Sequence, residues 1–449
     1  MIFKISLMVL FFEFVFSFEG QAQKLWTLDE CIAYGLEHSL EQEITGQDAA
    51  ISKEHWKQSK RNLLPVVGVS YPGYNVSFGR TLDPVTNTYV ERRFVSGIRG
   101  GLSSSITLFE GFRKWHQLAY QRLQYENSKY LAQQAKYDLA FKIMDLFSNV
   151  LFLEGALEIV KEQQRSNLLH YQTVNKKVAL GLMAKADLYE MEATVSGDSL
   201  SVLQAENRLD MAKLGLLQEM NLQETTIAIT VGLTTNELPE TDVKEVFNSA
   251  LETLPQLKLS ALSVASAKKD LAISKSAFYP RIGLSAAINT SFSDNIKDAS
   301  GTTVPFSEQI KNNQNKFVGF SFSFPIFGNG RVWSQTKVSK IRLNKAKVKF
   351  KLEQQRAYKQ IQEMLQKNKA LNAEELLNQK QLRAKEQAYK VAQKRFEKEL
   401  INLYDLQIAS NSYLNAKIEQ LRILVEKSIQ KHYLDFYKGK FKLPTMASN

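Results

Sequence analysis

The chain has 449 residues, more than one ordinary globular domain, so its length favours several domains or an internal repeat. Its composition, 44% hydrophobic and 23% charged, is close to that of globular proteins and excludes a disordered chain. The net charge of +12 is spread along helical segments among glutamates and glutamines and forms no compact basic patch, so no nucleic-acid partner is expected.

Residues 1–22 are expected to be a secretory signal peptide. Lys4 is followed by an apolar run over residues 5–18, interrupted by Glu13 and Ser17, and residues 20–22 offer small side chains for cleavage. A membrane anchor is the alternative, which Glu13 disfavours. No later stretch reaches the roughly 18–20 apolar residues of a transmembrane helix. The mature chain is therefore expected outside the cytoplasm, as a soluble protein or as a membrane barrel.

Three segments of the first half recur in the same order in the second half. Residues 64–70, 108–115 and 182–188 correspond to residues 279–285, 326–333 and 400–406. The distance from Trp115 to Trp333 equals that from Asp187 to Asp405, so the stretch between them has no net insertion. A duplication is predicted, with a first repeat over residues 23–254 and a second over residues 255–449.

Each repeat is predicted to contain a pair of strands. Apolar side chains alternate with small polar ones over residues 67–78, 94–108, 282–289 and 318–326. The alternation of the first strand shifts at Pro72-Gly73, which suggests a bulge. Polar loops over residues 80–93 and 293–316 join the strands, as is typical of the extracellular loops of membrane barrels.

The alternation fits either a soluble sandwich or a barrel whose apolar face contacts lipid. Four strands cannot close a barrel, because the smallest bacterial barrels have about 8 strands. Open sheet edges are not tolerated in lipid, so several chains would have to share one barrel, and a trimer would supply twelve strands.

Two long helices follow each strand pair. Residues 113–180 and 331–400 contain no proline and one glycine, Gly155, and apolar residues recur at three- and four-residue steps. Return helices are predicted over residues 187–220 and 405–437. An all-helical rod would explain these helices, but it leaves the alternating strands unexplained.

Several short motifs, taken in order, resemble the TolC-like outer-membrane efflux protein family, the outer membrane factors. They are residues 26–31 at the start of the first helix, the strands led by Pro65 and Pro280, the strand exits 108–111 and 324–328, and residues 394–406. The resemblance covers nearly the whole mature chain. It implies a mostly α-helical fold with a membrane β-barrel portion, in which a homotrimer shares a 12-stranded barrel and an α-helical tunnel of coiled-coil-like hairpins.

The resemblance also implies a function and partners. The chain would be the channel subunit of a tripartite efflux or type I secretion system, located in the cell outer membrane with a periplasmic helical portion. Its partners would be a periplasmic adaptor (membrane fusion protein), an inner-membrane transporter and outer-membrane lipid. The alternative is a soluble periplasmic coiled-coil adaptor or scaffold, which predicts a single hairpin and is disfavoured by the duplicated hairpins and strand pairs.

By the same resemblance, residues 181–188 and 399–406 are the tips of the helical hairpins. The candidate adaptor contacts in them are Gly181, Leu182, Met183, Leu400 and Ile401. The family usually has a glycine at the turn. Gly181 fits this pattern, whereas Glu399 stands at the equivalent position of the second repeat.

Asp187, Glu190 and Asp405 are candidates for a carboxylate ring at the pore constriction, where three copies of a carboxylate would attract cations. Ile408 occupies the position equivalent to Glu190, which weakens the ring in the second repeat. The alternative for both aspartates is helix N-capping, and one residue could serve both roles.

Trp115 and Trp333 follow the strand exits, where aromatic anchors lie at a membrane interface, although packing against a neighbouring helix is an equal alternative. The single cysteine, Cys31, excludes an internal disulfide and is expected to be buried on the first helix. The five histidines show no metal-ligand spacing, and no nucleophile or phosphate-loop motif is present. No catalytic residue, metal or cofactor is expected, and the chain is predicted not to be an enzyme.

Overall fold

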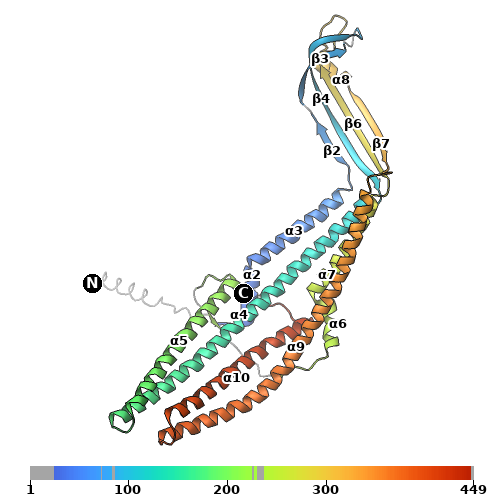
Figure 1. The fold of residues 1–449 in the computed structure, drawn as a ribbon. Coiled ribbons are helices and arrows are strands. Elements are labelled where there is room, and N and C mark those ends of the chain that lie inside the picture. Colours follow the sequence, from blue (N-terminus) through green and yellow to red (C-terminus); the bar gives the residue numbers. More distant parts are fainter. Residues whose placement is uncertain (1–24, 72, 83–85, 225–226, 230–236, 446–449) are drawn as a thin grey trace, which may run out of the picture. The chain divides into compact units, whose positions relative to one another are not determined.

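The computed structural model describes residues 25–71, 73–82, 86–224, 227–229 and 237–445 (Figure 1). The predicted signal peptide lies outside these residues. The chain forms two compact units. The helical unit comprises the described residues up to Thr45, Leu131–Lys258 and the residues from Glu353 onward, and the sheet unit comprises Gly46–Tyr130 and Leu259–Leu352. The predicted duplication, with its boundary between residues 254 and 255, stays a prediction.

The long helices form where they are predicted. The described helices are α2 (Leu28–His38), α3 (Leu40–Arg61), α4 (Arg113–Ala179), α5 (Lys185–Met220), α6 (Val243–Thr253), α7 (Pro255–Ser276), α8 (Phe306–Asn312), α9 (Arg331–Glu397) and α10 (Leu403–Tyr437). Thr27 and Glu30 form a capping box that fixes the start of α2. Among the described helices, none combines the length and the apolar character needed to cross a membrane.

The strands are β1 (Leu25–Trp26), β2 (Val66–Ser70), β3 (Tyr74–Leu82), β4 (Tyr89–Glu110), β5 (Ala228–Ile229), β6 (Arg281–Ser293) and β7 (Asn315–Ser323). β1 and β5 form a small parallel pair, and the other five form an antiparallel sheet in the order β2-β4-β6-β7, with β3 also on β4 (Figure 1). The first predicted strand is therefore interrupted. Gly73 has a φ of 95° at the break, and Pro72 lies outside the described residues.

Several strand boundaries differ from the sequence prediction, and two of them have a clear physical reason. Residues 80–93 are not a long loop, because the ladder continues past Gly79↔Arg93 to Leu82↔Tyr89, with a register shift between Gly79 and Thr81. The backbones of β3 and β4 stay hydrogen-bonded over this stretch although most of its side chains are polar. β7 ends at Ser323 and not at Ile326, since Pro325 has no N–H group to donate to a ladder.

The sheet has one apolar and one polar face. On β4, Leu102 and Ile106 pair with Ile288 and Leu284 of β6, whereas the intervening positions carry small polar side chains. Large apolar side chains on the first face are exposed in the single chain: Val67, Val69, Val76, Phe78, Phe94, Leu102, Ile288, Val318, Phe320 and Phe322. Among the described residues, no element of the sheet unit covers this face.

Within the helical unit, two hydrophobic clusters join a short helix to each long hairpin. α2 packs through Cys31 and Ile32 against α4 and α5, and its Gly35 lies so close to Ile143 that a Cβ there would force the end of the Ile143 side chain to shift. α6 packs in the corresponding way against α9 and α10, around Val246 and Ile361. Cys31 is buried, as predicted.

Candidate functional site

The two hairpin tips have the same backbone geometry. Gly181 ends α4 with a φ of 75°, and Leu182 N–H donates to the Lys177 carbonyl over 2.8 Å. Glu399 ends α9 with a φ of 62°, and Leu400 N–H donates to the Arg395 carbonyl over 2.9 Å. Both are Schellman caps. Glu399 therefore adopts the left-handed conformation that a glycine usually supplies, and the second tip closes as the first does.

The predicted adaptor-contact residues divide into two groups. Leu182 and Leu400 are 62% and 68% exposed at the two turns. Met183 and Ile401, which follow them, pack inward against a buried cluster. Each tip thus has one projecting leucine and one anchoring apolar side chain, and Gly181 provides the turn.

Both tips share one hydrophobic cluster. Its buried members come from all four hairpin helices: Val174, Met191, Tyr389, Phe396, Leu403 and Leu406. At its edge, the Lys177 ammonium lies 3.0 Å from the Glu399 carboxylate, and Gln407 donates to the Thr194 hydroxyl over 2.6 Å. The sequence alone did not suggest this ion pair.

Asp187 and Asp405, two of the candidate constriction residues, lie in the first turns of the return helices, but they do not cap them. The N-cap of α5 is Ala184, and the N-cap of α10 is Asn402, whose side chain accepts from Asp405 N–H over 2.8 Å. The N-capping interpretation of Asp187 and Asp405 is therefore wrong. Both carboxylates stand at the third helical position, where the helix dipole favours a negative charge. Glu190 is exposed on α5, next to the tip.

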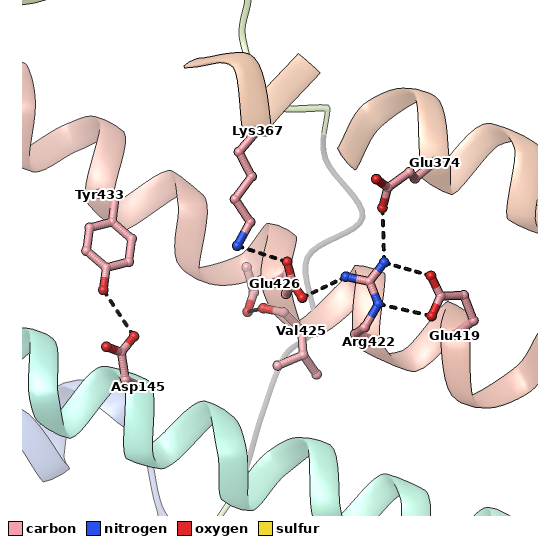
Figure 2. A network of polar contacts seen from close by, with 9 residues as sticks. Asp145, Lys367, Glu374, Glu419, Arg422, Val425, Glu426 and Tyr433 are labelled. Carbon is pink, nitrogen blue, oxygen red and sulfur yellow. Dashed lines mark hydrogen bonds and ion pairs between the residues drawn. The ribbon is translucent and has the colours of Figure 1, made fainter. Parts of the chain in front are cut away.

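A polar network joins α9 to α10 within the helical unit (Figure 2). The Arg422 guanidinium lies 2.6 Å from Glu419, 2.7 Å from Glu426 and 3.0 Å from Glu374. The Lys367 ammonium lies 3.0 Å from Glu426. Hydrogen bonding, first of all to Glu419, raises the pKa of Arg422, while partial burial opposes it. Partial burial raises the pKa of Glu426, but the hydrogen bonds from Lys367 and Arg422 outweigh it and leave this pKa lowered. The network therefore stays charged at neutral pH.

The seam between α9 and α10 also contains a buried ion pair. The Lys427 side chain is 1% exposed and the Glu375 side chain 11%, and their charged groups are 2.5 Å apart. Asn368, Asn378 and Gln430 are also buried in this hairpin. Their side-chain oxygens have no hydrogen-bond partner among the described residues.

The aromatic residues predicted at the membrane interface occupy the third positions of α4 and α9 in the sheet unit. Trp115 is 59% exposed and Trp333 is 76% exposed. The Trp333 ring meets Phe278 edge to face, with centroids 5.9 Å apart. Within the described part of the chain, no group of His, Cys, Asp and Glu side chains is arranged to hold a metal ion.

Residues 246–434 match the family model of outer membrane efflux proteins. This match covers most of the second predicted repeat and supports the resemblance to outer membrane efflux proteins. A comparison with curated proteins found no match. Among solved structures, CusC matches with a TM-score of 0.79 and 16% identity, covering 92% of this chain and 92% of that one. The CmeC outer membrane channel of Campylobacter jejuni matches with a TM-score of 0.80 and 15% identity over 93% of this chain and 86% of that one. The MtrE outer membrane channel of Neisseria gonorrhoeae matches with a TM-score of 0.74 and 19% identity over 94% and 91%.

The structural matches confirm the predicted fold, in which long helical hairpins are combined with a strand portion. CmeC and MtrE are outer membrane channels, and the family model that matches residues 246–434 describes outer membrane efflux proteins. The soluble adaptor, which was the alternative, is not supported.

Proposed function

We propose that three copies of this chain share a twelve-stranded barrel and a helical tunnel, and that this channel serves a tripartite efflux or type I secretion system. The observation that carries the proposal is the sheet. Its apolar face is uncovered, and among the described strands β7 pairs only with β6, while β2 and β3 pair only with β4. A lipid-facing sheet requires its edges to be paired, so neighbouring copies must join β7 of one chain to β2 and β3 of the next.

We further propose that the hairpin tips dock a periplasmic adaptor, which connects the channel to an inner-membrane transporter. The projecting Leu182 and Leu400 support this proposal, because two equivalent turns each expose a leucine beside a side chain that packs inward. Exposed apolar side chains on rigid turns are suited to anchor a partner helix.

Asp187, Glu190 and Asp405 are proposed to form the carboxylate lining of the periplasmic constriction. Their position next to the tips supports this role. Three copies of each would concentrate cations at a narrow opening.

Reconstitution of the purified protein tests the proposal. A trimer that depends on detergent and forms pores in planar bilayers is expected, whereas a water-soluble monomer without pores would contradict it. Leu182→Asp combined with Leu400→Asp should abolish binding of the cognate adaptor and leave the trimer and its conductance intact. A double variant that still binds the adaptor would remove the tips from the docking surface.

The same recordings test the constriction. Asp187→Ala combined with Asp405→Ala should weaken block by Mg²⁺ added on the tip side, because two of the three carboxylates of the proposed lining are lost. Asp210→Ala, which removes an exposed carboxylate of α5 farther from the tip, serves as the control. Equal block in the double variant and the wild type would remove both aspartates from the constriction.

A further inference from the structure

The sheet unit contains a polar cavity of about 650 Å³ that the tip residues do not touch. It lies where the polar face of the sheet reaches the end of α3 and the beginning of α4. Its sheet side is lined by the apolar residues Val66, Ile106 and Leu284 and by five small residues of the polar face: Ser105, Thr107, Gly283, Ser285 and Ser321. Thr107 pairs with Gly283 and Gly283 with Ser321, so these residues lie side by side on one face.

The charged side chains around this cavity are mostly cationic. Arg61, Arg113, Lys114 and Arg281 line it, and Glu110 is the carboxylate among its lining residues. We call these five residues with the small polar face the basic pocket. Arg281 and Glu110 are opposite each other on β6 and β4.

Most of the positive charge in the basic pocket is not neutralised. Arg61 pairs with Glu54 over 2.8 Å. In the described part of the chain, no carboxylate lies within ion-pair distance of Arg113, Lys114 or Arg281. The first turn of α4 has no acidic residue, so the positive end of its helix dipole adds to the same potential.

The chain turns sharply to place these cations. Gly111 and Phe112 have φ values of 64° and 62° between the end of β4 and the start of α4. A Cβ on Gly111 would lie 2.6 Å from the Ser276 carbonyl oxygen. This turn brings Arg113 and Lys114 back over the polar face instead of letting them extend away from it.

We infer that the basic pocket is a binding site for anionic solutes that carry a carboxylate or phosphate group, and that it makes the strand side of the channel favour anions. The inference rests on the proposed function, because only a shared barrel makes the polar face the wall of a water-filled lumen. Guanidinium groups bind carboxylates and phosphates with paired hydrogen bonds, and small neighbouring side chains leave room for the anion. Three copies would surround the lumen with a positive ring at the level of the helix–strand junction.

Planar-bilayer recordings test the inference with citrate as the probe. Arg113→Gln, Lys114→Gln and Arg281→Gln are combined in one variant, and citrate is added on the strand side. The concentration of citrate for half block should rise by at least about tenfold, equivalent to about 1.4 kcal/mol. The reversal potential in a KCl gradient should shift toward cation preference.

A variant with the same loss of charge provides the control. Lys337→Gln, Lys345→Gln and Lys349→Gln remove three exposed lysines of α9 that do not line the pocket. This variant should retain citrate block. Equal block and equal reversal potential in the wild type and the pocket variant would overturn the inference while leaving the channel itself established. A wild-type protein that forms no pores would instead contradict the proposed function.

Discussion

Glu399 is in a conformation that L-amino acids rarely adopt. Its φ of 62° places it in the left-handed region, and its carboxylate forms the ion pair with Lys177. A left-handed residue other than glycine costs roughly 1–2 kcal/mol. The contact with Lys177 links the two tips, and Gly181 at the equivalent turn could not supply it. The sequence shows the departure from glycine at this position, but the partner is visible only once the tips are packed together.

The backbone requirement at Gly181 gives a direct prediction. Gly181→Ala should destabilise the first tip by about 1 kcal/mol, because alanine must adopt a positive φ there. The cost is conformational, since no atom lies within 4 Å of the added Cβ. Hydrogen exchange of the tip peptides would detect the faster local opening. Gly197→Ala, at a helical position of α5 with equally open space, should instead slow exchange, and identical behaviour of the two variants would contradict this explanation.

His170 predicts a pH dependence of tip stability. Burial against Phe396 lowers its pKa below the ordinary value of 6.5, and the charge of Glu397 only partly offsets this. The unfolded chain therefore binds a proton more readily than the folded chain. Stability is fully present above pH 6.5 and is lost as the pH falls through 6.5 toward the lowered pKa.

The measurement is the thermal midpoint at pH 7.5 and 5.5, values chosen about one unit on either side of the ordinary histidine pKa. His170→Gln should reduce the loss of stability on acidification. His55→Gln, which removes an exposed histidine of α3, should leave it unchanged. His432, whose pKa burial also lowers, accounts for the dependence that remains. An unaltered pH dependence in the His170 variant would exclude this residue as a cause.

The two hairpins differ in the chemistry of their seams. α4 and α5 meet through apolar side chains, for example Ile143, Phe147 and Leu216. α9 and α10 instead bury Lys427 and Glu375. A polar layer holds one register of two helices, but it contributes less stability than an apolar layer. We therefore expect this ion pair to hold the register of α9 and α10 and to contribute less stability than an apolar layer would.

A double-mutant cycle tests this account. Lys427→Met alone should destabilise the protein by about 3–5 kcal/mol, because the buried Glu375 carboxylate loses its cationic partner and keeps only the hydrogen bond from Gln379. The double change Lys427→Met with Glu375→Leu should recover most of that loss, since apolar side chains of similar volume replace the pair. Thermal unfolding of the detergent-solubilised protein gives the values. Additive losses would show that the two side chains are not coupled.

The helices were predictable because long runs without proline and with regular apolar spacing specify them. Their ends were less so. A glycine at position 181 predicts the first turn, whereas a glutamate at position 399 gives no indication that this residue has a positive φ. N-capping is the alternative that the sequence offers for Asp187 and Asp405, because aspartate is a common N-cap, but the caps are Ala184 and Asn402. The Lys427–Glu375 pair could not be predicted, because it depends on the register between two helices.

For the whole molecule, the uncovered apolar face of the sheet determines the environment that the protein requires. Leu102 lies in β4 on this face, and Ser103 follows it on the polar face. Leu102→Arg should cost about 2–4 kcal/mol in a bilayer, because the charge would face hydrocarbon near the middle of the strand. Ser103→Arg should be tolerated, since its side chain faces water in the proposed lumen.

The fraction of folded, heat-modifiable protein in lipid vesicles provides the readout for this pair. Equal assembly of both variants would contradict a lipid-facing role for the apolar side. Alternation in the sequence was sufficient to assign the two faces. It did not locate the strand ends. The pairing of β3 with β4 continues past polar residues as far as Leu82↔Tyr89. β7 ends at Ser323, because Pro325 has no backbone N–H group to donate.

The unpaired edges of the sheet predict how a defective chain affects intact chains that are expressed with it. A copy with one defective sheet edge could still pair through its other edge and enter a trimer. The barrel of that trimer could not close, so the intact copies in it would also be inactive. Mixed expression of intact and defective chains should therefore reduce export by more than the proportion of defective chains. Such variants would be dominant-negative rather than recessive.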